Sequence, residues 1–215
     1  MTSSSSSRRA ILDRIGAATA SQTGNAEYDQ LPRAYIHRGE LDGESRIHLM
    51  TERLREYGAD VAESMPGLLP TVIAEQLQQS GRRSFVVPIG LPPAWMPAGF
   101  KWNIDHALDA AEIENCDGVV TGASAGIADS GTIVLHHSSM EGRRIITLLP
   151  DWHLCVINAS QIVETLPEYF ERCPEPPALA TYISGPSATA DIEMTRIQGV
   201  HGPRFLSVIL VRDDR

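Results

Sequence analysis

Residues Phe205–Val211 read FLSVILV, a run in which only Ser207 is polar. A strand with one face in solvent alternates apolar and polar side chains, whereas a strand covered on both faces is almost continuously apolar. The run therefore predicts a central strand with layers packed on both sides. Parallel strands need crossover connections, which are usually helices, so this segment favours an α/β fold over an all-β or all-α fold.

Shorter helix and strand patterns alternate along the rest of the chain. Helices are expected at Ser45–Tyr57, which Gly58 would end, and at Pro70–Gln79. A helix over Ser160–Arg172 would kink or split at Pro167. Strands are expected at Ala59–Ala62, Phe85–Val87, Gly118–Gly122, Thr132–His136, Leu154–Asn158 and Thr181–Ile183. This alternation predicts a mostly parallel sheet with helices on both faces.

The N-terminal part of the chain differs in composition from the remainder. Ser3–Ser7 is a serine run that we expect to be disordered, and Arg8–Ala18 has the spacing of a short helix. Thr19–Gly43 is rich in Gly, Asn, Asp, Gln and Pro, as is typical of a tether. We therefore divide the chain into a flexible arm, residues 1–43, and an α/β domain, residues 44–215. The arm either docks on a partner or is a mobile tail.

Composition excludes several classes of function. No apolar run approaches the roughly 20 residues that cross a bilayer, and Met1–Arg9 lacks the apolar core of a signal peptide, so we expect a cytoplasmic protein. The cysteines Cys116, Cys155 and Cys173 are too scattered to ligate an iron–sulfur cluster or a structural zinc. The seven histidines suggest no metal site. A net charge of −9 disfavours a nucleic-acid partner but allows a small anionic ligand.

The first segment with chemical potential is Gly122–Leu135, GASAGIADSGTIVL. Gly126 and Gly131 allow tight turns and the close approach of a ligand to main-chain N–H groups. Hydroxyls of Ser130 and Thr132 would bind the ligand, and Asp129 would act as a general base, a nucleophile or a hydroxyl acceptor. The alternative is a simple hydrogen-bonded turn, and the local sequence favours that alternative.

The second segment joins Ser184–Glu193 to Gly199–Arg204, with Gly-Pro dipeptides near both ends that stiffen its loops. His201 would donate or accept a proton near neutral pH, although a structural histidine explains the same spacing. The arginine pair at Arg143 would reach an anionic ligand, or else lie in a solvated turn. The remaining binding candidates contribute backbone N–H groups, hydroxyls or orienting charges: Gly185, Ser187, Thr189, Asp191, Gly202 and Arg204.

Three runs, GIADSGTIVL, SGPSATADIE and GVHGPR, occur in this order before the terminal apolar strand. Together they resemble the LUD-domain proteins, and in particular the lactate utilisation protein C subgroup. The resemblance covers about Arg46 to Arg212. Asp129 and Ser130 stand where Glu and Thr are commoner, which keeps the chemistry. Ala188 stands where Arg or Lys is commoner, which removes a positive charge beside Ser187.

The resemblance implies a fold like that of ribose-phosphate isomerase, glucosamine-phosphate deaminase and CoA transferases. It also implies a role in oxidising L-lactate to pyruvate together with iron–sulfur partner proteins, with no cofactor in this chain itself. Whether the chain is an enzyme or an accessory subunit stays open. One alternative is a free-standing enzyme of this fold that acts on a sugar phosphate or an acyl-CoA through Asp129. Another is a non-catalytic interaction subunit that docks through its arm.

Overall fold

The computed structural model describes residues 3–20, 30–32, 34–186, 188–189, 197–198 and 201–212. The chain divides into two compact units, Met1–Tyr35 and Ile36–Arg215. The first unit contains helix α1, Ser3–Thr19. The predicted helix is therefore present, but the predicted disorder of Ser3–Ser7 is wrong, because the helix begins within the serine run. Once a helix has formed, each further residue adds a hydrogen bond at little cost, so propagation toward the N-terminus explains the difference.

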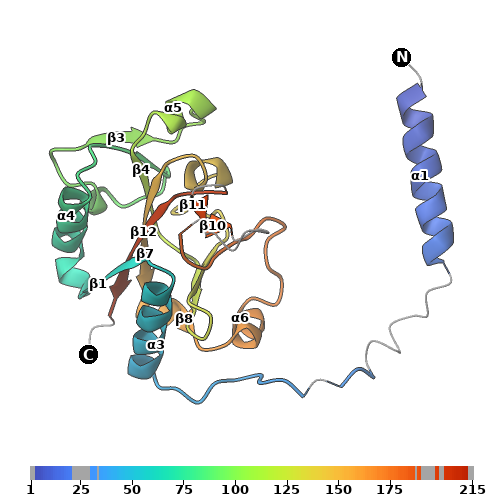
Figure 1. Cartoon of the computed structure of the whole chain (residues 1–215), viewed down its shortest axis with the longest axis horizontal. Coiled ribbons are helices and arrows are strands. Elements are labelled where there is room, and N and C mark those ends of the chain that lie inside the picture. Colours follow the sequence, from blue (N-terminus) through green and yellow to red (C-terminus); the bar gives the residue numbers. More distant parts are fainter. Residues whose placement is uncertain are drawn as a thin grey trace. The chain divides into compact units, whose positions relative to one another are not determined.

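The second unit is built on a six-stranded sheet in which every recorded strand pair is parallel (Figure 1). Its strands, in spatial order, are β1 Asp60–Ser64, β12 Phe205–Val211, β7 Trp152–Asn158, β4 Gly118–Thr121, β2 Ser84–Val87 and β3 Lys101–Ile104. The apolar run β12 lies inside the sheet between β1 and β7, and six of its seven residues are buried. The predicted central parallel strand is therefore confirmed.

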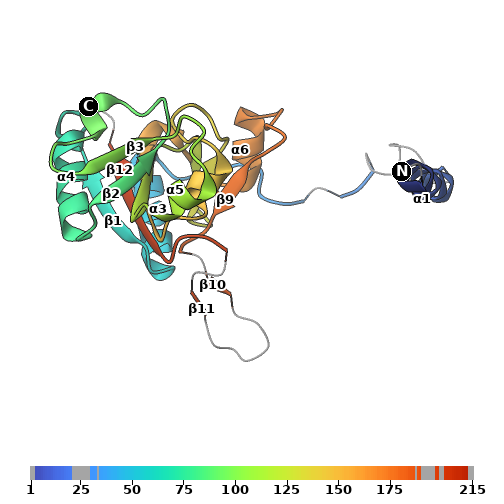
Figure 2. The same ribbon diagram turned by 90° about the horizontal axis from the view of Figure 1, so that it is seen from above.

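The two faces of this sheet are covered by different layers. Helix α4, Leu69–Gln79, covers one face and packs Ile73 and Leu77 against it, while α3, Gly43–Glu56, packs Met50 and Leu54 against the other. The second face also carries a four-stranded sheet that the sequence did not predict. Its order is β8 Ile162–Val163, β5 Ala125–Ile127, β6 Thr132–Leu135 and β9 Thr181–Ile183. Figure 2 shows α4 and β9 on opposite sides of the main sheet.

Shorter elements complete the fold. The segment predicted as one helix over Ser160–Arg172 is split into a 3-10 turn, Ala159–Gln161, the strand β8 and the helix α6, Leu166–Arg172. Pro167 lies in the first turn of α6, where its missing N–H costs nothing. The other elements are α5 Ala110–Glu114, β10 Ala188–Thr189, β11 Ile197–Gln198 and the 3-10 turns Pro66–Leu68, Pro93–Trp95 and Arg144–Thr147. No described helix has the length and apolar character needed to span a bilayer.

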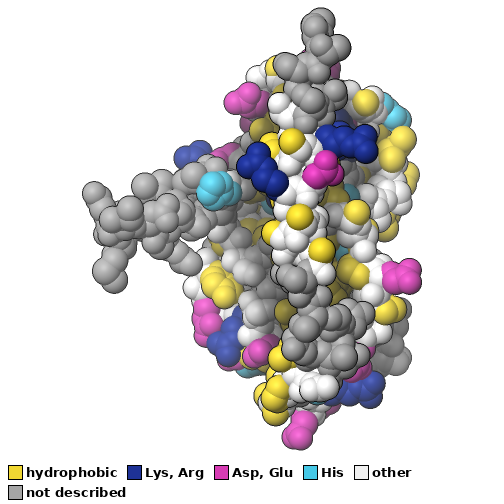
Figure 3. Space-filling view, turned by 90° about the vertical axis from the view of Figure 1, so that its right-hand side faces the viewer, with side chains coloured by type: hydrophobic (Ala, Val, Ile, Leu, Met, Phe, Trp, Pro, Cys, Tyr) yellow, Lys and Arg dark blue, Asp and Glu magenta, His cyan; other side chains and the backbone are white. Residues whose placement is uncertain are grey.

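Some of the surface charges form ion pairs. On the face drawn in Figure 3, basic and acidic side chains lie in small groups among polar and hydrophobic ones. Bidentate contacts join Arg204 to Asp151, and Arg53 pairs with Glu56 on α3. The chain has 27 acidic residues against 18 lysines and arginines, so an arginine inside a pocket whose described lining lacks acidic side chains is of interest for function.

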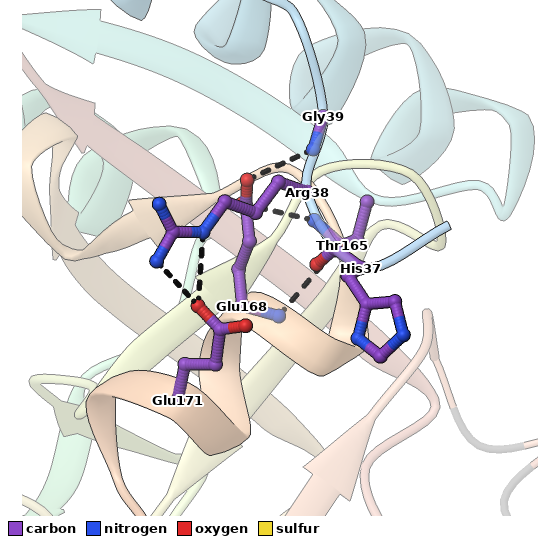
Figure 4. A network of polar contacts seen from close by, with 6 residues as sticks. All are labelled: His37, Arg38, Gly39, Thr165, Glu168 and Glu171. Carbon is purple, nitrogen blue, oxygen red and sulfur yellow. Dashed lines mark hydrogen bonds and ion pairs between the residues drawn. The ribbon is translucent and has the colours of Figure 1, made fainter. Parts of the chain in front are cut away.

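Residues 37–41 form a strap across α6 (Figure 4). The N–H of Gly39 donates to Glu168 Oε1 at 2.9 Å, and the N–H of Leu41 donates to Glu164 Oε2 at 2.7 Å. Arg38 forms an ion pair with Glu171. The second unit therefore starts at Ile36, and the last residues that the sequence assigned to the arm are attached to the domain.

We predict that Gly39→Ala loosens the strap. A Cβ on Gly39 would overlap the carboxylate of Glu164, which would have to move and release the N–H of Leu41. Trypsin cleavage after Arg38 should become faster, while the melting temperature of the domain should change little. The matched control is Gly67→Ala, where a Cβ meets nothing within 4 Å. Equal cleavage rates in Gly39→Ala and wild type would contradict this account of the strap.

Candidate functional site

The two predicted segments meet along the antiparallel pair β6 and β9. A chain of hydroxyl contacts connects their ends, with 2.7 Å between Ser130 Oγ and Thr132 Oγ1 and 2.8 Å between Thr132 Oγ1 and Ser184 Oγ. Segments that are about 50 residues apart in sequence thus share one hydrogen-bond network. The two segments are therefore in direct contact in the folded chain.

The glycines of these segments are required for close packing. Gly131 has φ +59°, and a Cβ there would lie 2.6 Å from the Cβ of Arg53. Gly185 has φ +84°, and its Cβ would overlap the side chain of Tyr57. A Cβ on Gly126 would lie 2.8 Å from Ile157 Cδ1. Both segment ends therefore press against α3, and the lack of a side chain at these positions permits the contact.

Beside this contact lies a pocket of 290 Å³, here called the inter-sheet pocket. It opens between the main sheet and β9, and its volume lies near the lower end of the usual range for ligand pockets, about 300–1,000 Å³. Its polar lining comes from Arg144, His153, Thr181, Ser184 and His201. The remaining lining residues are Thr147, Leu148, Tyr182, Ile183, Gly185, Pro186, Gly202, Pro203 and Leu206. Three predicted residues, His201, Gly185 and Gly202, are therefore brought together.

The charge of the inter-sheet pocket is positive. Its described lining contains Arg144 and two histidines but no aspartate or glutamate. The Arg144 side chain is exposed, and among the described residues it has no ion pair or hydrogen-bond partner. An unpaired guanidinium presents a fork of N–H donors that matches a carboxylate.

His153 forms a buried part of the pocket wall. It is 1% exposed, and its Nε2 lies 2.7 Å from Thr121 Oγ1. Burial lowers the pKa of His153 to about 4, so the ring is neutral at pH 7. The neighbouring Cys155 is also buried, and burial raises the pKa of its thiol to about 12. Sequence analysis did not identify His153 as a site residue, because a single histidine beside Trp152 is not part of any recognisable motif.

Glu141 anchors the loop that follows β6. It is 1% exposed, and its carboxylate accepts hydrogen bonds from Ser124 Oγ at 2.5 Å and from the N–H of His136 at 2.6 Å. In the same loop, the ring of His137 bridges the carbonyl of Gly142 and Thr181 Oγ1. Because Thr181 lines the pocket, this network holds one wall in place. Among the residues that the structure describes, no group of His, Cys, Asp and Glu side chains is arranged to hold a metal ion.

Other predicted residues lie elsewhere. Asp129 is exposed in the β5–β6 turn, where its N–H donates to the carbonyl of Glu164 and its own carbonyl accepts from Arg53 Nε. The turn alternative therefore describes its main-chain contacts, and Asp129 does not line the inter-sheet pocket. Thr189 lies on β10, whereas Ser187 and Asp191 fall outside the described residues.

Two predicted arginines are held by acidic partners instead of facing the pocket. Arg143 forms a bidentate contact with Asp105, with Nε–Oδ2 at 2.8 Å and Nη2–Oδ1 at 2.5 Å, and this contact lowers the pKa of the Asp105 carboxyl. Arg204 is likewise bound to Asp151. The neighbour of Arg143, Arg144, lines the pocket in its place. Sequence alone does not separate these two adjacent arginines, because Asp105 is 38 residues away.

We predict that His153 makes stability depend on pH. Between pH 6.5 and pH 4 the unfolded histidine binds a proton that the folded one excludes, so stability falls as pH falls through this window, by on the order of 3 kcal/mol. In His153→Gln that part of the pH dependence should disappear, as measured by urea unfolding at pH 7 and pH 4.5. The exposed His106 supplies the control variant, His106→Gln, which should keep the wild-type difference. An unchanged difference in His153→Gln would refute the buried neutral ring.

This arrangement of sheets and segments has counterparts among known proteins. Residues 100–211 match the family model described as the LUD domain. A Deinococcus radiodurans protein named "Lactate utilization protein C" is 39% identical over 77% of this chain and 79% of its own length. A protein of the same name from Geobacillus thermodenitrificans is 26% identical over 94% of this chain and 93% of its own.

The solved structures include a related fold. The crystal structure of a DUF162 family protein from Deinococcus radiodurans has a TM-score of 0.67 and 33% sequence identity, and it covers 80% of this chain and 99% of that one. Family model, sequence relatives and solved structure thus agree with the resemblance carried by the three motifs. The chain belongs to the LUD domain family.

Proposed function

We propose that this chain is a cytoplasmic component of a system that oxidises L-lactate to pyruvate, and that its inter-sheet pocket binds a small carboxylate such as lactate. The observation that carries the binding proposal is Arg144, which has no acidic partner among the described residues and lies in a pocket whose described lining contains no acidic side chain, in a protein of net charge −9. The names of the relatives support the link to lactate.

The pocket offers a complementary group for each part of lactate. The carboxylate pairs with the guanidinium of Arg144. The hydroxyl lies within the reach of groups that both donate and accept hydrogen bonds, Thr181, Ser184 and the neutral ring of His153. The methyl group packs against Leu206, which is 3% exposed and belongs to the same lining.

Oxidation of lactate to pyruvate breaks an O–H bond and a C–H bond and releases two protons and two electrons. We assign the electrons to iron–sulfur partner proteins. In this scheme the chain binds and orients the substrate, His201 in the pocket lining accepts the hydroxyl proton, and the proton of the C–H bond leaves with the two electrons to the partner proteins. The chain therefore works as a subunit of a complex.

Arg144→Gln tests the binding step. The variant removes the charge and keeps a polar side chain, so affinity for L-lactate should fall about tenfold or more, as measured by isothermal titration calorimetry at constant ionic strength. The matched control is Arg83→Gln, an exposed arginine in the turn before β2, and it should bind lactate like wild type. Wild-type affinity in Arg144→Gln would exclude this pocket as the carboxylate site.

The cellular role is tested by complementation. A strain that lacks the gene should fail to grow on L-lactate, and the wild-type gene should restore growth while Arg144→Gln should not. A tagged copy purified from lactate-grown cells should carry iron–sulfur proteins with it. Normal growth of the deletion strain on lactate, together with a tagged protein that recovers no iron–sulfur partner, would overturn the proposal.

A further inference from the structure

A second cavity lies at the opposite end of the same strands, at the carboxyl ends of β1, β7 and β12. Its volume is 550 Å³, and it is here called the arginine pocket. Met65, Ala159 and Arg212, the residues that directly follow these three strands, line it. Open α/β sheets bind ligands outside the carboxyl ends of their strands. The inter-sheet pocket, by contrast, is lined by Leu206 and His153 near the beginnings of β12 and β7, about 20 Å away along the strands.

The lining of the arginine pocket contains three arginines and one glutamate. Arg46 comes from the first turns of α3, Arg172 from the end of α6, and Arg212 follows β12. Arg212 is neutralised, because it pairs with Glu44 at 2.5 Å and with Glu63 at 2.6 Å. The other two arginines supply the free positive charge.

One N–H group of the Arg46 guanidinium is buried without a hydrogen-bond acceptor. The atom is Nε, and it is the one such side-chain atom in the described part of the chain. A buried N–H without an acceptor is costly, and more so when the group is charged. The oxygens of Glu168 accept from the N–H groups of Gly39, Glu164 and Thr165, which lower the pKa of its carboxyl against the effect of burial, and the charge of Arg46 adds only a smaller lowering. Arg46 therefore has no ion pair with it.

Arg172 approaches from the other side and is only partly engaged. Its Nη1 donates to the carbonyl of Ser160 at 3.2 Å, which leaves its other donors available, and it has no acidic partner among the described residues. Ser160 itself lines the pocket and adds a hydroxyl. Two guanidinium groups on different helices, a hydroxyl and the first turn of α3 thus surround one volume.

We propose that the arginine pocket binds the phosphate group of a small molecule. Two guanidinium groups match a doubly charged oxyanion, whose several oxygens accept from both, better than they match a monocarboxylate. Arg46 and Arg172 both line the pocket, so the terminal N–H groups of their guanidiniums are the donors expected to hold these oxygens. The ligand is either inorganic phosphate or a phosphate ester, and the site is independent of the carboxylate site at Arg144.

The proposal is tested by titrating the full chain with inorganic phosphate and, separately, with AMP, at constant ionic strength. Wild type should bind at least one of these probes, and both Arg46→Gln and Arg172→Gln should weaken that binding about tenfold. Arg83→Gln should bind like wild type. Tighter binding of AMP than of phosphate assigns the site to a phosphate ester, and equal binding assigns it to the free ion. Lactate affinity should be unchanged in Arg46→Gln, which separates this site from the inter-sheet pocket.

Thermal melting of each variant checks folding. If Arg46→Gln unfolds, Arg172→Gln decides alone, because Arg172 is exposed at the end of α6. Failure of wild type to bind either probe would overturn the proposal, and so would binding that survives intact in the folded variants. Neither outcome bears on the lactate proposal, which rests on Arg144.

Discussion

The packing of the buried face of α3 on the core that both sheets share is the contact on which the rest of the domain depends. Met50 and Leu54 have no exposed surface. The same helix meets both glycine-containing segments, at Gly131 and at Gly185, so it sets how closely they approach each other. The first turns of α3 also carry Arg46 into the arginine pocket. The buried face of this helix thus contacts both glycine-containing segments, and its first turn lines the arginine pocket.

The sequence predicts those parts of the fold that depend on local pattern. The run at Phe205–Val211 identifies a central parallel strand, because its apolar character does not alternate. The strands β6 and β9 were predicted, but their pairing in a second sheet with the short strands β5 and β8 was not, because that pairing depends on long-range packing. Ser3–Ser7 shows the opposite case, in which local composition suggests disorder but a neighbouring helix extends through it.

The residues of the candidate site likewise divide into those that a local motif predicts and those that only the folded structure identifies. His201, Gly185 and Gly202 were predicted from their motif and do line one pocket. Arg143 was predicted from its type, but its partner Asp105 binds it, and Arg144 takes the position on the pocket. His153 has no motif, and only its burial makes it distinctive. Ion-pair partners and burial are properties of the folded chain, so they decide between residues that look equivalent in sequence.

The central claim is that Arg144, which has no acidic partner in the described part of the chain, marks a carboxylate site between the sheets. The most direct measurement is a crystal structure of the full chain with L-lactate. We predict electron density for lactate in the inter-sheet pocket, with its carboxylate within hydrogen-bond distance of the Arg144 guanidinium and its hydroxyl facing Ser184 and Thr181. Lactate bound elsewhere, or an inter-sheet pocket that stays free of lactate in a saturated crystal, would contradict the claim.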